Sequence, residues 1–176
     1  MSEVQEPIPA KTKVITDEDV AFAYEVLRLC PKAFLGGSYV VHGREAGDID
    51  VVVPHVEWRP LRAALSGRIT KVRKDIPTEA EDESDLLDDD RLVTVYRRGN
   101  VDLLVIRDEF VPSYLKAVEA MQRDPEAYQE RDARVAVHIY YADEYRREND
   151  LPLEEEIVAM RRLNGSKRRG NTGDYG

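Results

Sequence analysis

Hydrophobic and polar positions change their spacing several times along the chain, and each spacing predicts a different element. Apolar residues at helical spacing follow Thr16, a good helix N-cap, and predict a first helix that ends before Pro31. Short apolar runs then alternate with further helical stretches. In chain order the pattern predicts a strand at 33–35, a short helix at 38–42, a strand at 48–53, a helix at 56–65 and a strand at 69–72.

The second half of the chain opens with two apolar runs and then becomes helical. The runs at 92–96 and 101–106 flank Gly99-Asn100, a turn signal that predicts a β-hairpin. Helical segments are then expected from Pro112 to Arg123, from Asp124-Pro125 through Val135 and His138, and over 153–163. This order predicts an α+β fold: a mixed β-sheet flanked by helices, with a helical C-terminal portion.

Charge is unevenly distributed and divides the chain further. The formal net charge is −9, and residues 75–90 alone hold nine acids and no Lys or Arg. We expect this acidic insert to be a loop or disordered. The expected organisation is a flexible arm at 1–14, a core at 15–110 that contains the acidic insert at 75–90, a helical portion at 111–163 and a disordered basic tail at 164–176.

Cysteine usage and hydropathy exclude several classes of protein. The single cysteine, Cys30, cannot form an internal disulfide, which fits a reducing compartment. Its position at the end of an apolar helical stripe favours a buried structural thiol. No apolar run is long enough to span a bilayer, and the polar N-terminus does not resemble a signal peptide. We therefore expect a cytoplasmic protein with no membrane partner.

Three aspartates mark the starts of two predicted strands. Asp48 and Asp50 share one face of their strand, because alternate strand side chains point the same way. Asp102 opens a second apolar strand, where burying a carboxylate costs free energy and therefore suggests a function. If the two strands are neighbours, the three carboxylates meet at one edge of the sheet. Oxygen-only ligands suit Mg²⁺ or Mn²⁺ rather than zinc, so Asp48, Asp50 and Asp102 are candidate metal ligands and catalytic residues.

A glycine turn precedes the acid pair. Gly36, Gly37 and Ser38 lead into the short predicted helix, and free backbone N–H groups at such a turn can bind an anion. Arg44 lies in the loop that follows and could hold a phosphate bidentately; a surface arginine without this role is an equally good interpretation. Gly36, Gly37, Ser38 and Arg44 are thus candidate nucleotide-binding residues. In the purely structural alternative, the glycines form a tight turn and the acids are solvated strand ends.

The Gly-Gly-Ser turn, the short helix, the Asp-x-Asp strand and the later Asp102 together resemble the nucleotidyltransferase superfamily of DNA polymerase beta. Aminoglycoside nucleotidyltransferases, CCA-adding enzymes and minimal nucleotidyltransferases belong to it. The resemblance covers residues 33–106 and implies a nucleoside triphosphate donor and divalent-metal catalysis. It implies that residues 36–38 contact the triphosphate, that Asp48 and Asp50 hold metal, and that Asp102 holds metal and helps to deprotonate the acceptor. The acidic insert and the short helical portion after Asp102 depart from the family pattern.

Three functional hypotheses follow. The first is a metal-dependent nucleotidyltransferase that moves a nucleoside monophosphate from a nucleoside triphosphate to a hydroxyl of RNA (tRNA included), a protein or a small molecule. The second is a non-catalytic binding protein whose acidic insert imitates a nucleic acid or inhibits a partner protein. The third is a toxin-like or antitoxin-associated transferase that differs from the first only in its acceptor. The nucleotide, the acceptor and the oligomeric state stay open at this stage.

Overall fold

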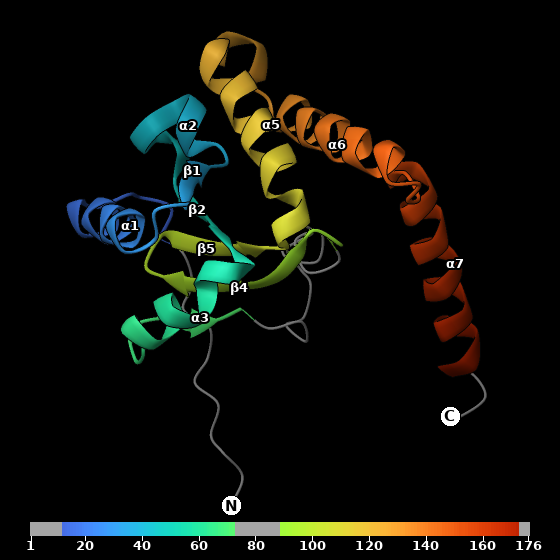
Figure 1. Cartoon of the computed structure of the whole chain (residues 1–176), viewed down its shortest axis with the longest axis horizontal. Coiled ribbons are helices and arrows are strands. Elements are labelled where there is room, and N and C mark those ends of the chain that lie inside the picture. Colours follow the sequence, from blue (N-terminus) through green and yellow to red (C-terminus); the bar gives the residue numbers. More distant parts are fainter. Residues whose placement is uncertain (1–11, 73–88, 173–176) are drawn as a thin grey trace, which may run out of the picture.

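The chain folds around one mixed β-sheet with helices on both faces, as a computed structural model shows (Figure 1). The structure describes residues 12–72 and 89–172, with side chains as far as residue 163. The predicted α+β class is confirmed. In chain order the main elements are α1 (Asp17–Leu29), β1 (Phe34–Gly36), α2 (Tyr39–His42), β2 (Ile49–Pro54), α3 (His55–Ala64), β3 (Thr70–Lys71), β4 (Leu92–Arg98), β5 (Val101–Ile106), α5 (Val111–Arg123), α6 (Arg131–Glu148) and α7 (Glu154–Thr172).

The sheet has five strands in the order β1-β2-β5-β4-β3. Its centre is the parallel pair of β2 and β5, and the other neighbours pair antiparallel. Parallel strands begin at the same edge of a sheet, so the first residues of β2 and β5 lie side by side. The predicted hairpin is present, with β4 and β5 joined through Gly99-Asn100.

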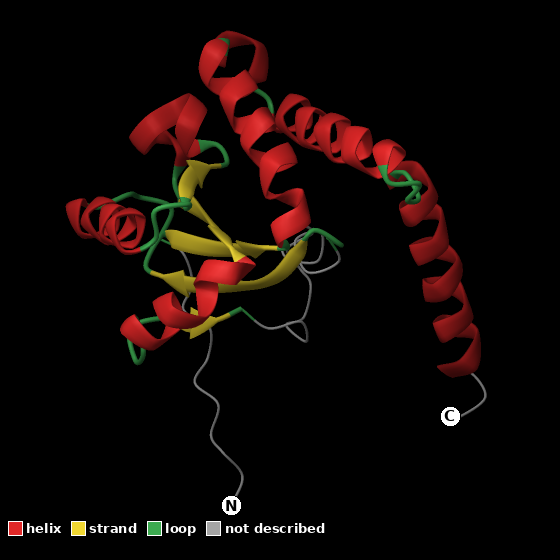
Figure 2. Cartoon of the chain, viewed as in Figure 1, coloured by secondary structure: helices red, strands yellow, loops and turns green. Residues whose placement is uncertain are grey.

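Each face of the sheet is covered by a different set of helices (Figure 2). Odd-numbered residues of β2 and β5 pack with side chains of α1 and α3, among them Phe22, Val26 and Trp58. Even-numbered residues such as Val52 and Leu104 pack instead with Phe110, Ala142 and side chains of α5 and α6. This alternation follows from the two-residue period of a strand, and it explains why both central strands are apolar throughout most of their length.

The start of α1 is tied to the hairpin turn. Thr16 and Asp19 form a capping box, in which each side chain accepts a hydrogen bond from the other residue's backbone N–H. Asn100 donates from its backbone N–H and from Nδ2 to the Asp19 carboxylate. Its carbonyl oxygen accepts a 2.8 Å hydrogen bond from the N–H of Ile49. Asn100 therefore holds together the start of α1, the hairpin turn and the beginning of β2.

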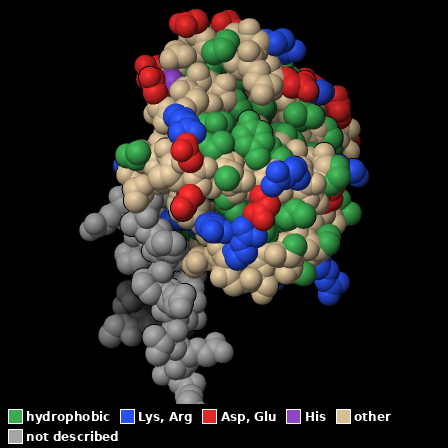
Figure 3. Space-filling view, turned by 90° about the vertical axis from the view of Figure 1, so that its left-hand side faces the viewer, with side chains coloured by type: hydrophobic (Ala, Val, Ile, Leu, Met, Phe, Trp, Pro, Cys, Tyr) green, Lys and Arg blue, Asp and Glu red, His purple; other side chains and the backbone are tan. Residues whose placement is uncertain are grey.

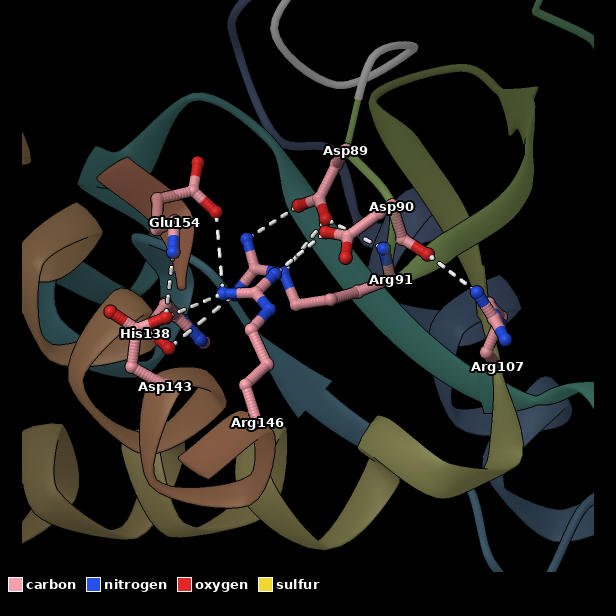
Figure 4. Close-up of polar contacts among 8 residues, drawn as sticks. All are labelled: Asp89, Asp90, Arg91, Arg107, His138, Asp143, Arg146 and Glu154. Carbon is pink, nitrogen blue, oxygen red and sulfur yellow. Dashed lines mark hydrogen bonds and ion pairs between the residues drawn. The ribbon is translucent and has the colours of Figure 1, made fainter. Parts of the chain in front are cut away.

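The C-terminal helices are joined by a cluster of charged side chains (Figure 4). The guanidinium of Arg146 on α6 is buried and pairs with Asp90 at 2.7 Å, Asp143 at 2.9 Å and Glu154 at 3.3 Å. The backbone N–H of Glu154 also donates to Asp143, which fixes the first turn of α7 against α6. These contacts connect the chain just before β4 to both helices.

Two helical segments differ from the sequence prediction. Asp124-Pro125 opens only a short 3₁₀ turn over Pro125–Tyr128, and α6 begins later at Arg131. Arg134 explains the interruption, because its guanidinium donates to the carbonyls of Tyr128 and Gln129 and closes a corner. The tail at 164–176 was expected to be disordered, but α7 continues to Thr172.

Two further expectations concern the arm and the acidic insert. Residues 1–11 of the arm and residues 75–88 of the insert lie outside the described residues. Asp89 and Asp90, the last two acids of the insert, are described and belong to the charged cluster around Arg91 and Arg146.

Cys30 is the buried structural thiol that its position predicted. Its Sγ donates to the carboxylate of Glu57 on α3. Burial and the neighbouring Glu57 raise the pKa of the thiol to about 12, so it is neutral and unreactive at physiological pH.

Candidate functional site

The three predicted aspartates converge at the edge where β2 and β5 begin. Asp50 lies directly opposite Asp102 in the parallel pair, and Asp48 precedes Asp50 by two residues. One carboxylate oxygen from each residue lies within 4.8 Å of the other two. Asp48 and Asp50 are half-buried and Asp102 is buried. The sequence predicted that the three carboxylates would meet only if the two strands were neighbours, and the structure pairs these strands.

The acids belong to a polar row that crosses the whole sheet. Strand register aligns Gly36, Asp50, Asp102, Arg97 and Thr70, in that spatial order from β1 to β3. The next row on the same face is apolar, and its members pack under α5 and α6: Phe34, Val52, Leu104, Val95 and Val72. Since the two rows are one side-chain repeat apart, the hydrophobic core ends where the polar row begins. The acids therefore stand at the rim of the core, on the face that α5 and α6 cover.

The glycine turn lies directly against the acid pair. Gly37 has a φ of +64°, and a Cβ placed on it would come within 2.2 Å of Oδ2 of Asp50. Only glycine fits this position, because it adopts the left-handed backbone without strain and has no Cβ to collide with Asp50. Ser38, the next residue, makes no capping hydrogen bond with its side chain. Because α2 is a single turn, any anion held here would be bound by the N–H groups of the turn rather than by a helix dipole.

Tyr114 of α5 forms part of the wall above the acids. Its ring approaches the position of Gly36, and it packs on the ring of His138 with centroids 4.2 Å apart. Burial raises the pKa of the Tyr114 hydroxyl, and the negative charge of Asp50 raises it further. Tyr114 is therefore a protonated hydroxyl beside the acid cluster, a role that helical spacing alone did not reveal.

Arg44 is placed in a surface ion pair. Its Nη2 lies 2.7 Å from Oδ1 of Asp17, and both side chains are exposed. The pair joins the loop after α2 to the first turn of α1. The phosphate-binding role expected for Arg44 would require this pair to open, whereas the alternative interpretation, a surface arginine, needs no change.

Arg97 was not singled out from the sequence, although it lies in the same row as the acids. Its Nε donates to Oδ1 of Asp102 at 2.8 Å, and the side chains of Arg97 and Asp102 are only 4% and 1% exposed. The predicted strand stopped at Tyr96, which left Arg97 outside it. The hairpin turn could have identified Arg97. A two-residue turn at Gly99-Asn100 pairs Arg98 with Val101, and the next pair is then Arg97 with Asp102.

The donor set fits a divalent cation. Three carboxylates at this spacing repel one another, and a hard cation with oxygen ligands relieves that repulsion. The cluster contains no His or Cys, which disfavours zinc. Arg97 places a positive charge at the edge of the cluster, paired with Asp102.

The outer surface on the side of α1 and α2 carries both signs of charge (Figure 3). Acidic and basic side chains are intermingled there, with hydrophobic side chains between them.

Comparisons of the chain with protein-family models, with curated proteins and with solved structures found no match. Within the described ranges, none of the helices combines the length and the apolar character that a membrane span requires.

Proposed function

We propose that the protein is a divalent-metal-dependent nucleotidyltransferase. It transfers a nucleoside monophosphate from a nucleoside triphosphate to a hydroxyl group of an RNA, a protein or a small molecule. One observation carries the proposal: carboxylates from the starts of two neighbouring parallel strands meet within 4.8 Å, directly beside a glycine turn. A cation site adjoining an anion-binding turn suits the triphosphate–metal complex that such a reaction uses.

Each residue has a defined task in this proposal. Asp48, Asp50 and Asp102 hold the metal, which when bound supplies Lewis-acid stabilisation of the phosphate oxygens. The N–H groups of the turn at Gly36, Gly37 and Ser38 orient the triphosphate. The acceptor oxygen forms a bond to the α-phosphorus, the bond from the α-phosphorus to the bridging oxygen of the β-phosphate breaks, and pyrophosphate leaves. The proton of the acceptor hydroxyl passes to the Asp102 carboxylate.

The local surroundings favour this chemistry over a structural role for the acids. Asp50 and Asp102 are placed opposite each other although the neighbouring row on the same face is apolar. Asp102 is only 1% exposed, so it is not a solvated strand end, and Arg97 compensates its charge. The half-buried Asp48 and Asp50 beside it are the acids that a bound cation would compensate in addition.

The decisive experiment compares Asp50→Asn with wild type. The protein is incubated with each labelled nucleoside triphosphate, Mg²⁺ and total RNA or lysate, and transfer of label to a macromolecule is measured. Asp50→Asn should abolish transfer and keep the wild-type circular dichroism spectrum, because a metal ligand charge is lost while the shape persists. Asp132→Asn, an exposed acid on α6, is the matched control and should transfer normally. Full activity of Asp50→Asn, or no transfer by wild type with any triphosphate, rejects the proposal.

A further inference from the structure

Arg97 is a buried cation that pairs with one of the candidate metal ligands, Asp102. It projects from β4 into the same row as Asp50 and Asp102, and its side chain is 4% exposed. The donor atom is Nε, which lies 2.8 Å from Oδ1 of Asp102. A bond from Nε leaves little freedom, because this nitrogen belongs to the rigid plane of the guanidinium. The geometry therefore restricts the orientation of the Asp102 carboxylate before any metal binds.

The position of the pair in the sheet makes the restraint specific. Arg97 and Asp102 are opposite residues of an antiparallel pair, while Asp102 and Asp50 are opposite residues of a parallel pair. Asp102 thus has a cation on one side and a second carboxylate on the other. Oδ1 of Asp102 is engaged by Arg97, and a carboxylate oxygen of the same residue lies within 4.8 Å of those of Asp48 and Asp50.

We propose that Arg97 is a positioning residue of the transfer reaction, which fixes the orientation of the Asp102 carboxylate toward the metal and the acceptor. This inference rests on the proposed nucleotidyltransferase function. Partners of metal ligands act in this way in metalloproteins generally, where losing one typically reduces metal affinity or activity about 10- to 100-fold.

A purely electrostatic role of Arg97 makes different predictions. Removing a positive charge beside three carboxylates should tighten cation binding, whereas losing the orientation of Asp102 should weaken it. Lysine retains the charge but not the planar Nε donor. An electrostatic counter-ion therefore tolerates Arg97→Lys, and a positioning residue does not.

The molecule offers a matched control for the loss of a buried arginine. Arg146 is 1% exposed and pairs with three carboxylates, but it lies between α6, α7 and the residue Asp90 rather than at the acid cluster. Arg146→Met should lower the melting temperature and leave Mn²⁺ binding and kcat of the folded protein unchanged. It separates the effect of a lost buried ion pair from an effect on the site.

The experiment measures Mn²⁺ binding by electron paramagnetic resonance, and kcat at saturating triphosphate, for Arg97→Lys, Arg97→Met, Arg97→Ala and Arg146→Met. We expect Arg97→Met to raise the Mn²⁺ dissociation constant, and to lower kcat, about 10- to 100-fold. Arg97→Lys should fall between Arg97→Met and wild type. In Arg97→Ala, millimolar guanidinium should restore part of the lost kcat, and it should have no such effect on Arg146→Met.

Each outcome decides a separate point. Wild-type Mn²⁺ binding and kcat in Arg97→Lys, or tighter Mn²⁺ binding in Arg97→Met, would overturn the positioning role. If Arg97→Met does not fold, Mn²⁺ binding and kcat of Arg97→Lys, compared with wild type, still decide whether Arg97 positions Asp102. Absence of transfer by wild type removes the proposed function itself, whereas active wild type with an unaffected Arg97→Lys removes only the inference about Arg97.

Discussion

The closest packing between the glycine turn and the acids occurs at a single residue, Gly37. Its α-carbon faces Oδ2 of Asp50, and the backbone there adopts a φ of +64°. A larger residue would strain the backbone and also displace the carboxylate. The turn and the candidate metal ligand Asp50 are therefore coupled through the missing side chain of Gly37.

Gly37→Ala should reduce both stability and metal affinity. A non-glycine residue in the left-handed region costs about 1–3 kcal/mol, and the added methyl group must push Asp50 out of the cluster. Gly67→Ala provides the control, since Gly67 has a φ of +78° but open space around its Cβ position. Urea unfolding should show a loss of stability in both variants, while Mn²⁺ titration should show weaker binding only in Gly37→Ala. Equal Mn²⁺ affinity in the two would contradict the coupling.

At the scale of elements, the helical C-terminal portion packs on the sheet through apolar side chains of α5 and α6, and a buried charged network adds a second junction. Arg146 and Arg91 lie close together among the carboxylates of Asp89, Asp90, Asp143 and Glu154 (Figure 4). Burial opposes ionisation of Asp89, but the hydrogen bonds and the charge of Arg91 outweigh it and hold the pKa of this carboxyl below its usual value. The segment before β4, α6 and α7 are thereby joined in one network.

Arg146→Met should destabilise this junction strongly. Removing one partner of a buried ion pair leaves carboxylates without compensation, which costs about 3 kcal/mol. Lys116→Met removes the exposed pair between Lys116 of α5 and Glu144 of α6, and it should have a much smaller effect. The free energy of unfolding in urea measures both. A similar loss in the two variants would show that the buried network contributes little.

At the scale of the whole molecule, the sheet separates two different environments. The face under α1 and α3 is apolar, whereas the face under α5 and α6 combines an apolar core with the acid row, Tyr114 and His138. Burial lowers the pKa of His138 to about 3, and the positive charge of Arg91 acts in the same direction. His138 therefore stays neutral in the folded protein while it accepts a proton in the unfolded chain at mildly acidic pH.

The stability of the whole fold should consequently fall as the pH is lowered below 6.5. The folded-state pKa of His138 is depressed from 6.5 to about 3, so the unfolded chain takes up a proton first, and stability is lost between these values. Between pH 6.5 and 5 we expect a loss of about 1–2 kcal/mol from this residue. Urea unfolding at both pH values should show that His138→Phe lacks this component and that replacing the exposed His55 by Gln does not remove it. An unchanged pH dependence in His138→Phe would contradict the assignment.

Much of the fold is readable from local pattern. Apolar spacing located the central strands and the first helix to within a residue or two, and Thr16 was identified as the cap of α1. Strand alternation placed Asp48 and Asp50 on one face because the side-chain period of two belongs to the backbone itself. These features depend on neighbouring residues, so the sequence determined them by itself.

The functional geometry depends on contacts between distant segments, which only the tertiary structure decided. Parallel pairing of β2 with β5 placed Asp102 opposite Asp50, and the antiparallel partner β4 contributed Arg97. The same long-range packing assigned Arg44 to Asp17 and brought Tyr114 over the acids. Register between strands is set by how whole faces bury against helices, and no local pattern carries that information.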